Sequence, residues 1–171
     1  MSAQTAVVVA FYSLCGTTET LALAAAVGAV QGRSLIRLRR LPDDGVPAPD
    51  GPICADALAR MRREYVAPAE KDIVGNAALI LVPSAGATPE SNEWAAFSTM
   101  LARLGSEGRL AGKVGAVIDT GNEMTVRSFA SLLDRVGLRR PGQDPAAASG
   151  DLDRQATAMG RRVATETRVS A

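Results

Sequence analysis

Short apolar runs alternate with helix-forming segments along the chain. Ala6 to Tyr12 is a run rich in β-branched and aromatic side chains, which predicts a strand buried on both faces. Glu19 to Val30 is almost all Leu, Ala and Val without proline, which predicts a helix packed against a sheet. The intervening residues 13–18 form a tight, hydroxyl-rich turn. The chain therefore opens with a strand, a turn and a helix.

The same alternation continues to the end of the chain. Ser34 to Leu41 alternates apolar and basic residues in part, as a strand near a sheet edge does, and Ala77 to Pro83 is apolar throughout, as in a central strand. Gly112 to Ile118 is predicted as the fourth strand. Leu138 to Pro145 has one aliphatic residue and two prolines, so a fifth strand there is short and at an edge. Helices are predicted over residues 53–65, from an N-cap at Asn92 to about residue 104, over 126–136 and over 151–166.

Several conspicuous side chains fit bland structural roles. Trp94 falls on an apolar helical stripe with Phe97, Leu101 and Leu104, which favours the core over a ligand platform. The arginines of the second helix are interpreted as a solvated face, and those of the second strand as a solvated edge rather than a site for the extra phosphate of NADPH. These six are Arg60, Arg62, Arg63, Arg37, Arg39 and Arg40.

Composition restricts the chemistry that the chain can perform. Its 171 residues, 47% of them apolar, predict one domain spanning residues 1–171. No apolar run approaches the ~20 residues of a membrane helix, and no secretory leader is recognisable, so we expect a soluble, cytoplasmic protein. The net charge of +1 argues against nucleic-acid binding. Histidine is absent, which excludes Ser-His-Asp and Cys-His mechanisms. Chemistry must then come from a cofactor or from carboxylates.

The cysteines and acidic residues suggest no metal or disulfide framework. Cys15 and Cys54 have no metal or redox spacing, so a disulfide is improbable. Cys15 is interpreted as a small residue in a tight loop, with a reactive thiol at the helix start as the alternative. Asp72, Asp119 and Glu123 do not form a defined ligand set, and we predict no metal.

The first turn is the strongest candidate for a binding site. Where a strand ends and a helix begins, backbone N–H groups and the positive end of the helix dipole converge, which favours an anion. Ser13, Thr17 and Thr18 can add hydroxyl donors, and Gly16 has no Cβ to hold a ligand away from the backbone. We therefore predict a phosphate site here.

Alternating strands and helices imply an α/β fold with a doubly wound parallel sheet between two helical layers. The first turn lacks the spaced glycines of a dinucleotide fingerprint and the lysine of a P-loop. A receiver domain needs acidic residues after the first strand and an aspartate after the third, where the chain has Tyr12-Ser13 and Pro83. A low-molecular-weight tyrosine phosphatase needs an arginine at the position of Leu21. These four folds are disfavoured.

Residues 11–22 resemble the phosphate loop of flavodoxin-like proteins. Tyr12-Ser13, two residues, Gly16, two residues and Glu19-Thr20 look most like the quinone oxidoreductases related to the tryptophan-repressor-binding protein. Weaker similarity covers Pro83-Ser84 and the Asp-Thr-Gly at 119–121. The resemblance implies strand order 2-1-3-4-5, FMN, electron transfer from NAD(P)H to a quinone or similar acceptor, and a homo-oligomer. The implied FMN-binding residues are Ser13, Leu14, Cys15, Gly16, Thr17, Thr18, Pro83, Ser84, Ala85, Gly86, Asp119, Thr120, Gly121 and Asn122, with ring contacts extending to Thr88.

Two other functions stay open. Relatives place an aromatic residue after the third strand to stack on the flavin ring, whereas Ser84 to Ser91 contains none. Asp119 and Glu123 also bring negative charge to the fourth loop. A flavodoxin-like interaction module or subunit without tight flavin binding is therefore the main alternative. A pure electron carrier is less favoured, because classical flavodoxins are strongly acidic. In an oligomer, Tyr65 or Trp94 of a neighbouring copy could supply the missing aromatic ring.

Overall fold

The computed structural model describes residues 6–49, 51–142 and 150–169, and its centre is a parallel sheet. Among these residues, four strands pair in the order β2-β1-β3-β4, which confirms the predicted order up to the fourth strand. The strands are β1 (Ala6–Phe11), β2 (Leu35–Arg40), β3 (Ala78–Val82) and β4 (Val114–Val117). In register, Val9 of β1 lies between Leu38 of β2 and Ile80 of β3. The fully buried β1 and β3 are central, and the partly exposed β2 is an edge, as predicted.

The fifth strand is reduced to one bridge in the described part of the chain. Arg139 pairs in parallel with Val114: its N–H donates to the carbonyl of Lys113 and its own carbonyl accepts from Gly115, both at 2.9 Å. Pro141, two residues later, has no N–H to continue a ladder. The predicted range of residues 138–145 is thus not a strand where it is described, and its residues 143–145 lie outside the described residues.

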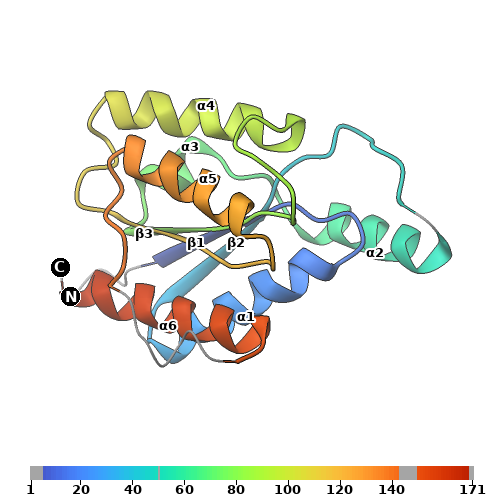
Figure 1. Ribbon diagram of the computed structural model, residues 1–171, viewed down its shortest axis with the longest axis horizontal. Helices are drawn as coiled ribbons and strands as arrows, with labels where there is room; N and C mark the ends of the chain where they lie inside the picture. Colours follow the sequence, from blue (N-terminus) through green and yellow to red (C-terminus); the bar gives the residue numbers. More distant parts are fainter. Residues whose placement is uncertain (1–5, 50, 143–149, 170–171) are drawn as a thin grey trace.

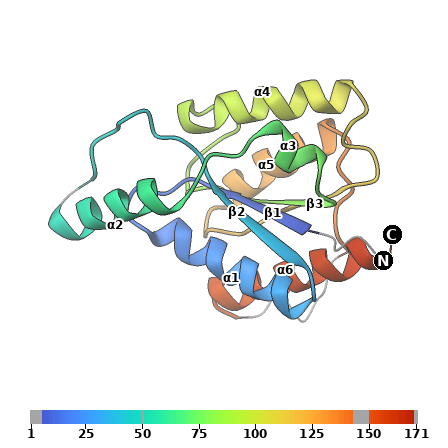
Figure 2. The ribbon, with the colours of Figure 1, turned by 180° about the vertical axis from the view of Figure 1, so that it is seen from behind.

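Helices cover both faces of the sheet in three layers (Figures 1 and 2). α1 (Thr17–Gln31) and α6 (Leu152–Val169) lie on one face. α4 (Asn92–Ser106), α5 (Glu123–Arg135) and the short α3 (Glu70–Val74) lie on the other. Side chains of β1 alternate between the two cores, with Val8 and Ala10 facing α4 and α5 and Val7 and Val9 facing α1 and α6. Within the described residues, no helix is long and apolar enough to cross a membrane.

The structure corrects several local predictions. α2 (Gly51–Glu64), predicted to begin at Ile53, begins two residues earlier and buries Leu58 and Met61, whereas Ile53 is 81% exposed because the first turn of α2 extends beyond the sheet. α3 was not predicted, because five residues are too few to show helical periodicity. Ser91, rather than Asn92, is the N-cap of α4. The apolar stripe of α4, including Trp94, is buried as predicted.

Candidate functional site

The turn between β1 and α1, residues 12–18, is hereafter the first loop. Gly16 is the N-cap of α1 and has a φ of +96°, a left-handed conformation that glycine adopts without strain. Its N–H donates to the hydroxyl oxygen of Ser13 at 2.9 Å, which holds the turn tight. The first amides of a helix have no intrahelical acceptor, and among the described residues no side chain caps α1. The first loop thus presents free N–H donors at the positive end of a fifteen-residue helix.

The loop after β3 contacts the first loop directly. Parallel strands end at the same edge of a sheet, and β1 and β3 are neighbours. The Ser84 hydroxyl donates to the carbonyl of Tyr12 at 3.2 Å and lies 3.4 Å from the Thr18 hydroxyl. Pro83 is buried, whereas Ala85 and Gly86 are exposed. The structure therefore brings together the predicted residues of these two loops.

The loop after β4 follows on the other side of β3. Asp119 accepts from the N–H of Gly121 at 2.8 Å, and the Asn122 side chain caps α5 by accepting from Thr125 at 3.1 Å. The Thr125 hydroxyl in turn accepts from the N–H of Gly86 at 2.8 Å, which ties this loop to the one after β3. Thr120 Oγ1 is buried and has no hydrogen-bond partner among the residues that the structure describes. A buried hydroxyl without a partner is costly unless a ligand or water completes it.

Arg40 holds the first loop from beneath. Its side chain is 5% exposed, and the guanidinium donates to the carbonyl of Ser13 through Nη2 at 2.8 Å and Nε at 3.1 Å. It also donates to Asp43 at 2.7 Å, and Asp43 accepts further hydrogen bonds from Arg62. The arginine hydrogen bonds, with that of Arg62 first, lower the pKa of Asp43 to about 2. The prediction of a solvated strand edge was therefore wrong for Arg40.

Arg39, on the same strand, is also paired. Its guanidinium donates to both carboxylate oxygens of Asp72 at 2.9 Å, and this hydrogen bonding lowers the pKa of Asp72. Sequence reasoning missed Asp72 because it lies on α3, 33 positions after Arg39.

A second ion pair joins α2 to the start of α1. Glu19, 4% exposed in the first turn of α1, accepts from Arg60 at 2.6 and 2.9 Å and from the Tyr65 hydroxyl at 2.6 Å. The Arg60 hydrogen bonds hold the pKa of Glu19 below its ordinary value, while burial and then Glu19 raise the pKa of Tyr65 to about 12. The arginines of α2 face solvent in part, as predicted, with the side chains of Arg60 and Arg62 39% and 42% exposed. In addition, Arg60 and Arg62 each pair with a buried carboxylate, which was not predicted.

A disulfide between Cys15 and Cys54 makes a covalent link at the same place. It joins the first loop to the first turn of α2, across 39 positions of sequence, with the Cα atoms 4.4 Å apart. The prediction that a disulfide is improbable was wrong, as was the assignment of Cys15 as a small loop residue. The spacing of two cysteines carries no signal of their pairing, because only the packing of α2 beside the first loop brings them together.

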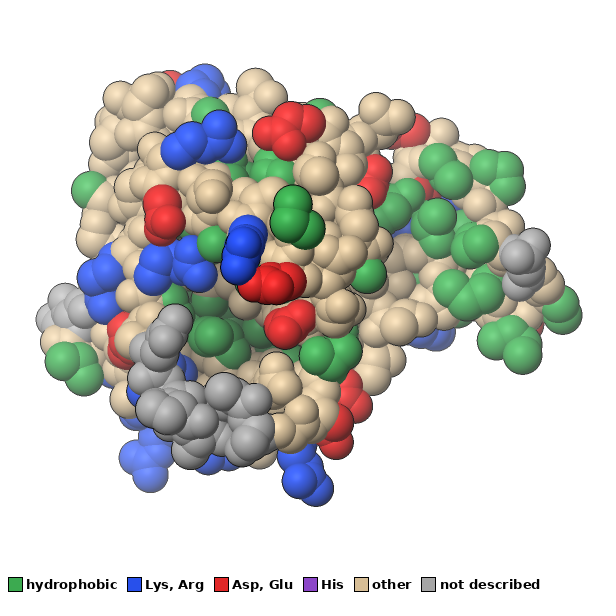
Figure 3. All heavy atoms as spheres, viewed as in Figure 1, with side chains coloured by type: hydrophobic (Ala, Val, Ile, Leu, Met, Phe, Trp, Pro, Cys, Tyr) green, Lys and Arg blue, Asp and Glu red, His purple; other side chains and the backbone are tan. Residues whose placement is uncertain are grey.

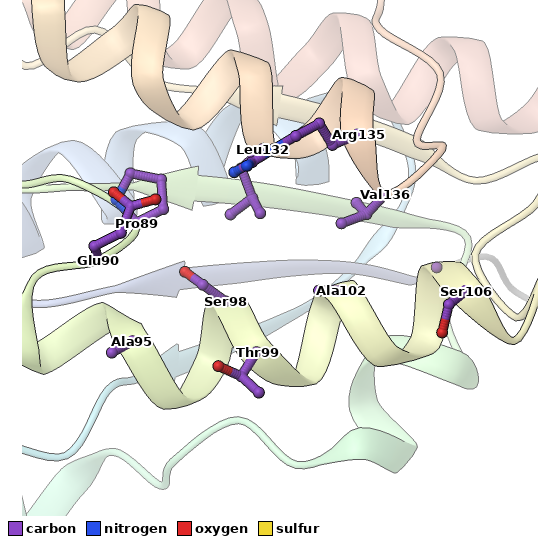
Figure 4. A pocket seen from close by; sticks show the side chains of 11 residues that line it. Pro89, Glu90, Ala95, Ser98, Thr99, Ala102, Ser106, Leu132, Arg135 and Val136 are labelled. Atoms are coloured by element: carbon purple, nitrogen blue, oxygen red, sulfur yellow. The ribbon is translucent and has the colours of Figure 1, made fainter.

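A depression of about 810 Å³ opens beside the first loop. It is lined by the loop, the side of α2 and the start of α6, including the acidic residues Glu19, Asp151 and Asp153 and the basic Arg60. A second depression, of about 530 Å³, lies between α4 and α5 and contains no residue of the first loop (Figure 4). The first is therefore the depression that adjoins the candidate anion site.

Trp94 and Tyr65, the two candidates for an aromatic ring beside the flavin, both pack against other aromatic rings. Trp94 is fully buried and packs against Phe97 and Phe129 with ring centroids 6.0 and 4.7 Å apart. Trp94 therefore cannot stack on a ligand of its own or a neighbouring copy. Tyr65 packs edge-on against Phe11 with its hydroxyl engaged by Glu19.

Comparison with known proteins places the fold. No protein-family model and no curated protein sequence matches the chain. A flavodoxin from Streptococcus pneumonia TIGR4 is 16% identical with a TM-score of 0.64, and covers 95% of this chain and 99% of its own. A WrbA-like flavodoxin from Agrobacterium tumefaciens is 15% identical with a TM-score of 0.62, and the match covers 98% of this chain and 100% of that one. A short-chain flavodoxin associated with a PDU bacterial microcompartment is 14% identical with a TM-score of 0.62, and the match again covers 98% of this chain and 100% of that one. These likenesses show a flavodoxin-like fold, as the resemblance of the first loop predicted.

Proposed function

We propose that this chain binds FMN at the carboxyl edge of its sheet and passes electrons from NAD(P)H to a quinone or similar small acceptor. The observation that carries the proposal is the uncapped start of α1, where Gly16 leaves the first-turn amides open to a phosphate. The flavodoxin-like fold supports it, because open α/β sheets bind ligands where the strand order reverses, and here that point lies between β1 and β3.

The described residues fit the phosphate end of FMN. Leu14 and Cys15 directly precede the N-cap Gly16, and Thr17 and Thr18 are the first two residues of α1, so their backbone and hydroxyl groups are available at this helix terminus. Thr17 is exposed and free to turn toward an anion. Farther along the edge, the partnerless hydroxyl of Thr120 offers a hydrogen bond to a polar atom of the ligand.

The bound flavin would supply hydride and single-electron chemistry, and the chain would supply position and shelter. The first loop anchors the phosphate, and Arg40 keeps that loop in place through Ser13. Backbone groups of residues 83–88 and 119–122 line the ring. No side chain need act as an acid or base, which agrees with the absence of histidine.

A titration tests the proposal. Purified protein, stripped of any flavin, is titrated with FMN by calorimetry, and riboflavin serves as the control that lacks the phosphate. We expect FMN to bind in the micromolar range or tighter and riboflavin at least tenfold more weakly, because the helix terminus contributes only to the former. Bound FMN should then be bleached by NADH or NADPH without oxygen and recover on adding a quinone. Equal binding of both flavins would contradict the phosphate site.

Two variants of one residue sharpen the test. Thr17→Asp places a carboxylate at the first position of α1, where it stabilises the helix but repels a phosphate. We expect at least tenfold weaker FMN binding with an unchanged or higher melting temperature. Thr17→Asn, a neutral change of similar size, should lose about threefold or less, since it removes one hydroxyl donor. Equal losses in the two variants would contradict an electrostatic phosphate site.

A second candidate is an interaction module or subunit that has lost tight flavin binding. It is favoured by one observation: among the described residues, the loops after β3 and β4 offer no aromatic side chain to the flavin ring. In this case folded protein binds neither FMN nor riboflavin saturably. A homo-oligomer also remains a proposal, which sedimentation of the full chain would test.

A further inference from the structure

The Cys15–Cys54 disulfide lies within the candidate phosphate loop and is open to chemical attack. Cys15 belongs to the first loop, and Cys54 to the first turn of α2. Both residues are partly exposed, so a small thiol can approach the sulfurs. The bond joins the loop that would hold a phosphate to an element from a different part of the chain.

α2 contributes few side chains to the core, so its position depends on the disulfide and on its ion pairs. Of its fourteen residues only Leu58 and Met61 are buried. In Figures 1 and 2, α2 projects sideways from the three layers, and Figure 3 shows hydrophobic side chains exposed on this projecting part. Ile53 of α2 and Val46 of the loop before it are 81% and 42% exposed. A helix with so little buried surface opens locally at low cost. The disulfide therefore restricts how far α2 can move.

α2 also controls the charge beside the phosphate site. The Glu19 carboxylate lies close to the N-cap of α1, where a Cβ built on Gly16 would be 3.6 Å from Glu19 Oε2. Arg60 of α2 neutralises this carboxylate with two hydrogen bonds. If α2 moves away, Glu19 stays in the first turn of α1 and its negative charge is no longer compensated. That charge opposes a phosphate at the same helix terminus.

We propose that the Cys15–Cys54 bond is a redox switch on flavin binding: the oxidised protein holds Arg60 against Glu19 and binds FMN, and the reduced protein releases α2 and binds FMN more weakly. The inference rests on the proposed function. In the reduction, the thiolate of a dithiol attacks one protein sulfur and releases the other as a thiolate, which leaves a mixed disulfide. The second thiol of the dithiol then attacks its own bonded sulfur and releases the first protein sulfur. The dithiol becomes a cyclic disulfide, and two electrons and two protons are gained by Cys15 and Cys54.

The test compares FMN affinity in the two redox states of the full chain. Thiol titration first verifies the absence of free thiols in oxidised protein and two after reduction with dithiothreitol. Calorimetry then gives the FMN dissociation constant in each state, in the dark. We expect reduction to weaken binding roughly fivefold to tenfold, the effect of one uncompensated charge at a helix terminus. Hydrogen exchange should rise in residues 51–64 and stay unchanged in α4.

Variants separate the bond from the charge. Cys54→Ser breaks the bond without altering the first loop, so it should bind FMN as weakly as the reduced protein and not respond to dithiothreitol. Cys15→Ser is the second variant should Cys54→Ser fold poorly. Arg60→Gln keeps the bond but removes the neutralising charge, and should weaken binding by a similar factor in oxidised protein.

The outcomes distinguish the two proposals. Equal FMN affinity in both redox states would overturn the switch but not the proposed FMN binding. Free thiols in protein that was purified without reductant and exposed to air would also overturn the switch, because the bond would not form. A response to dithiothreitol that persists in Cys54→Ser would also overturn it. Absence of FMN binding in both states would refute the proposed function and the switch with it.

Discussion

Replacing Arg40 with methionine removes the cation that holds the first loop. Arg40 makes three hydrogen bonds, two to the carbonyl of Ser13 and one to Asp43, from a side chain that is 5% exposed. Methionine can fill the space of the aliphatic stem but donates no hydrogen bond. The Ser13 carbonyl then loses both of these bonds. Asp43 keeps its hydrogen bonds from Arg62 and the N–H of Gly45.

The expected loss of stability is about 3 kcal/mol. Breaking a buried ion pair by removing one partner costs roughly 3–5 kcal/mol, because the other charge is left buried. Arg62 still pairs with Asp43 in this variant, so the loss from the unpaired charge lies at the low end of this range. The buried Ser13 carbonyl, left without its donor, adds about 1 kcal/mol or more to the loss. Burying methionine costs less desolvation energy than burying a guanidinium, and this partly offsets the loss.

Urea unfolding followed by circular dichroism measures this loss. Arg37→Met is the matched control: Arg37 is on the same strand but exposed, so its replacement should change the free energy of unfolding by less than about 0.5 kcal/mol. Arg40→Met should also weaken FMN binding, since the first loop loses its support. A free energy of unfolding equal to that of Arg37→Met would refute the reasoning.

Two further predictions concern packing and pH. Gly28→Ala places a Cβ 1.9 Å from the carbonyl oxygen of Thr157 on α6, so α1 and α6 must separate. We expect the free energy of unfolding, measured in urea, to fall by about 2–4 kcal/mol, although alanine has the higher helix propensity. The control Gly108→Ala has φ +71° and no neighbour within 4 Å, so it should lose only about 1 kcal/mol, and equal losses would refute the clash. Because the pKa of Asp43 is lowered to about 2, its contribution of about 2 kcal/mol is present above about pH 4 and disappears as the pH falls to about 2. The difference in stability between the wild type and Asp43→Asn should therefore shrink over that range, and a constant difference would refute it.

Local patterns were sufficient for most of the fold. The strands of residues 6–12 and 77–83 are continuous apolar runs, and α4 has a repeating apolar stripe, so each carries its signal within one element. The tight turn of the first loop could also be predicted, because a hydroxyl-rich turn with one glycine between a strand and a helix has few conformations. The fifth strand was the least certain, since Pro141 interrupts any ladder there.

Hydrogen bonds, ion pairs and the disulfide between residues far apart in the sequence could not be predicted. Arg40, Arg60 and Cys15 each looked like ordinary surface or loop residues, and each proved to have a partner in a distant segment of the chain. Ion pairs and disulfides produce no periodic pattern in the sequence, because the two partners can be at any separation along the chain.

The sequence by itself determined the order of the four paired strands and the two-sided burial of β1 and β3, and it predicted an anion site at the start of α1. These follow from periodicity and backbone chemistry, which act over a few residues. Only the tertiary structure decided that α2 lies beside the first loop, bonded through Cys54 and paired through Arg60. That placement depends on packing between segments 39 positions apart, and it determines both the charge at the candidate phosphate site and its proposed response to oxidation.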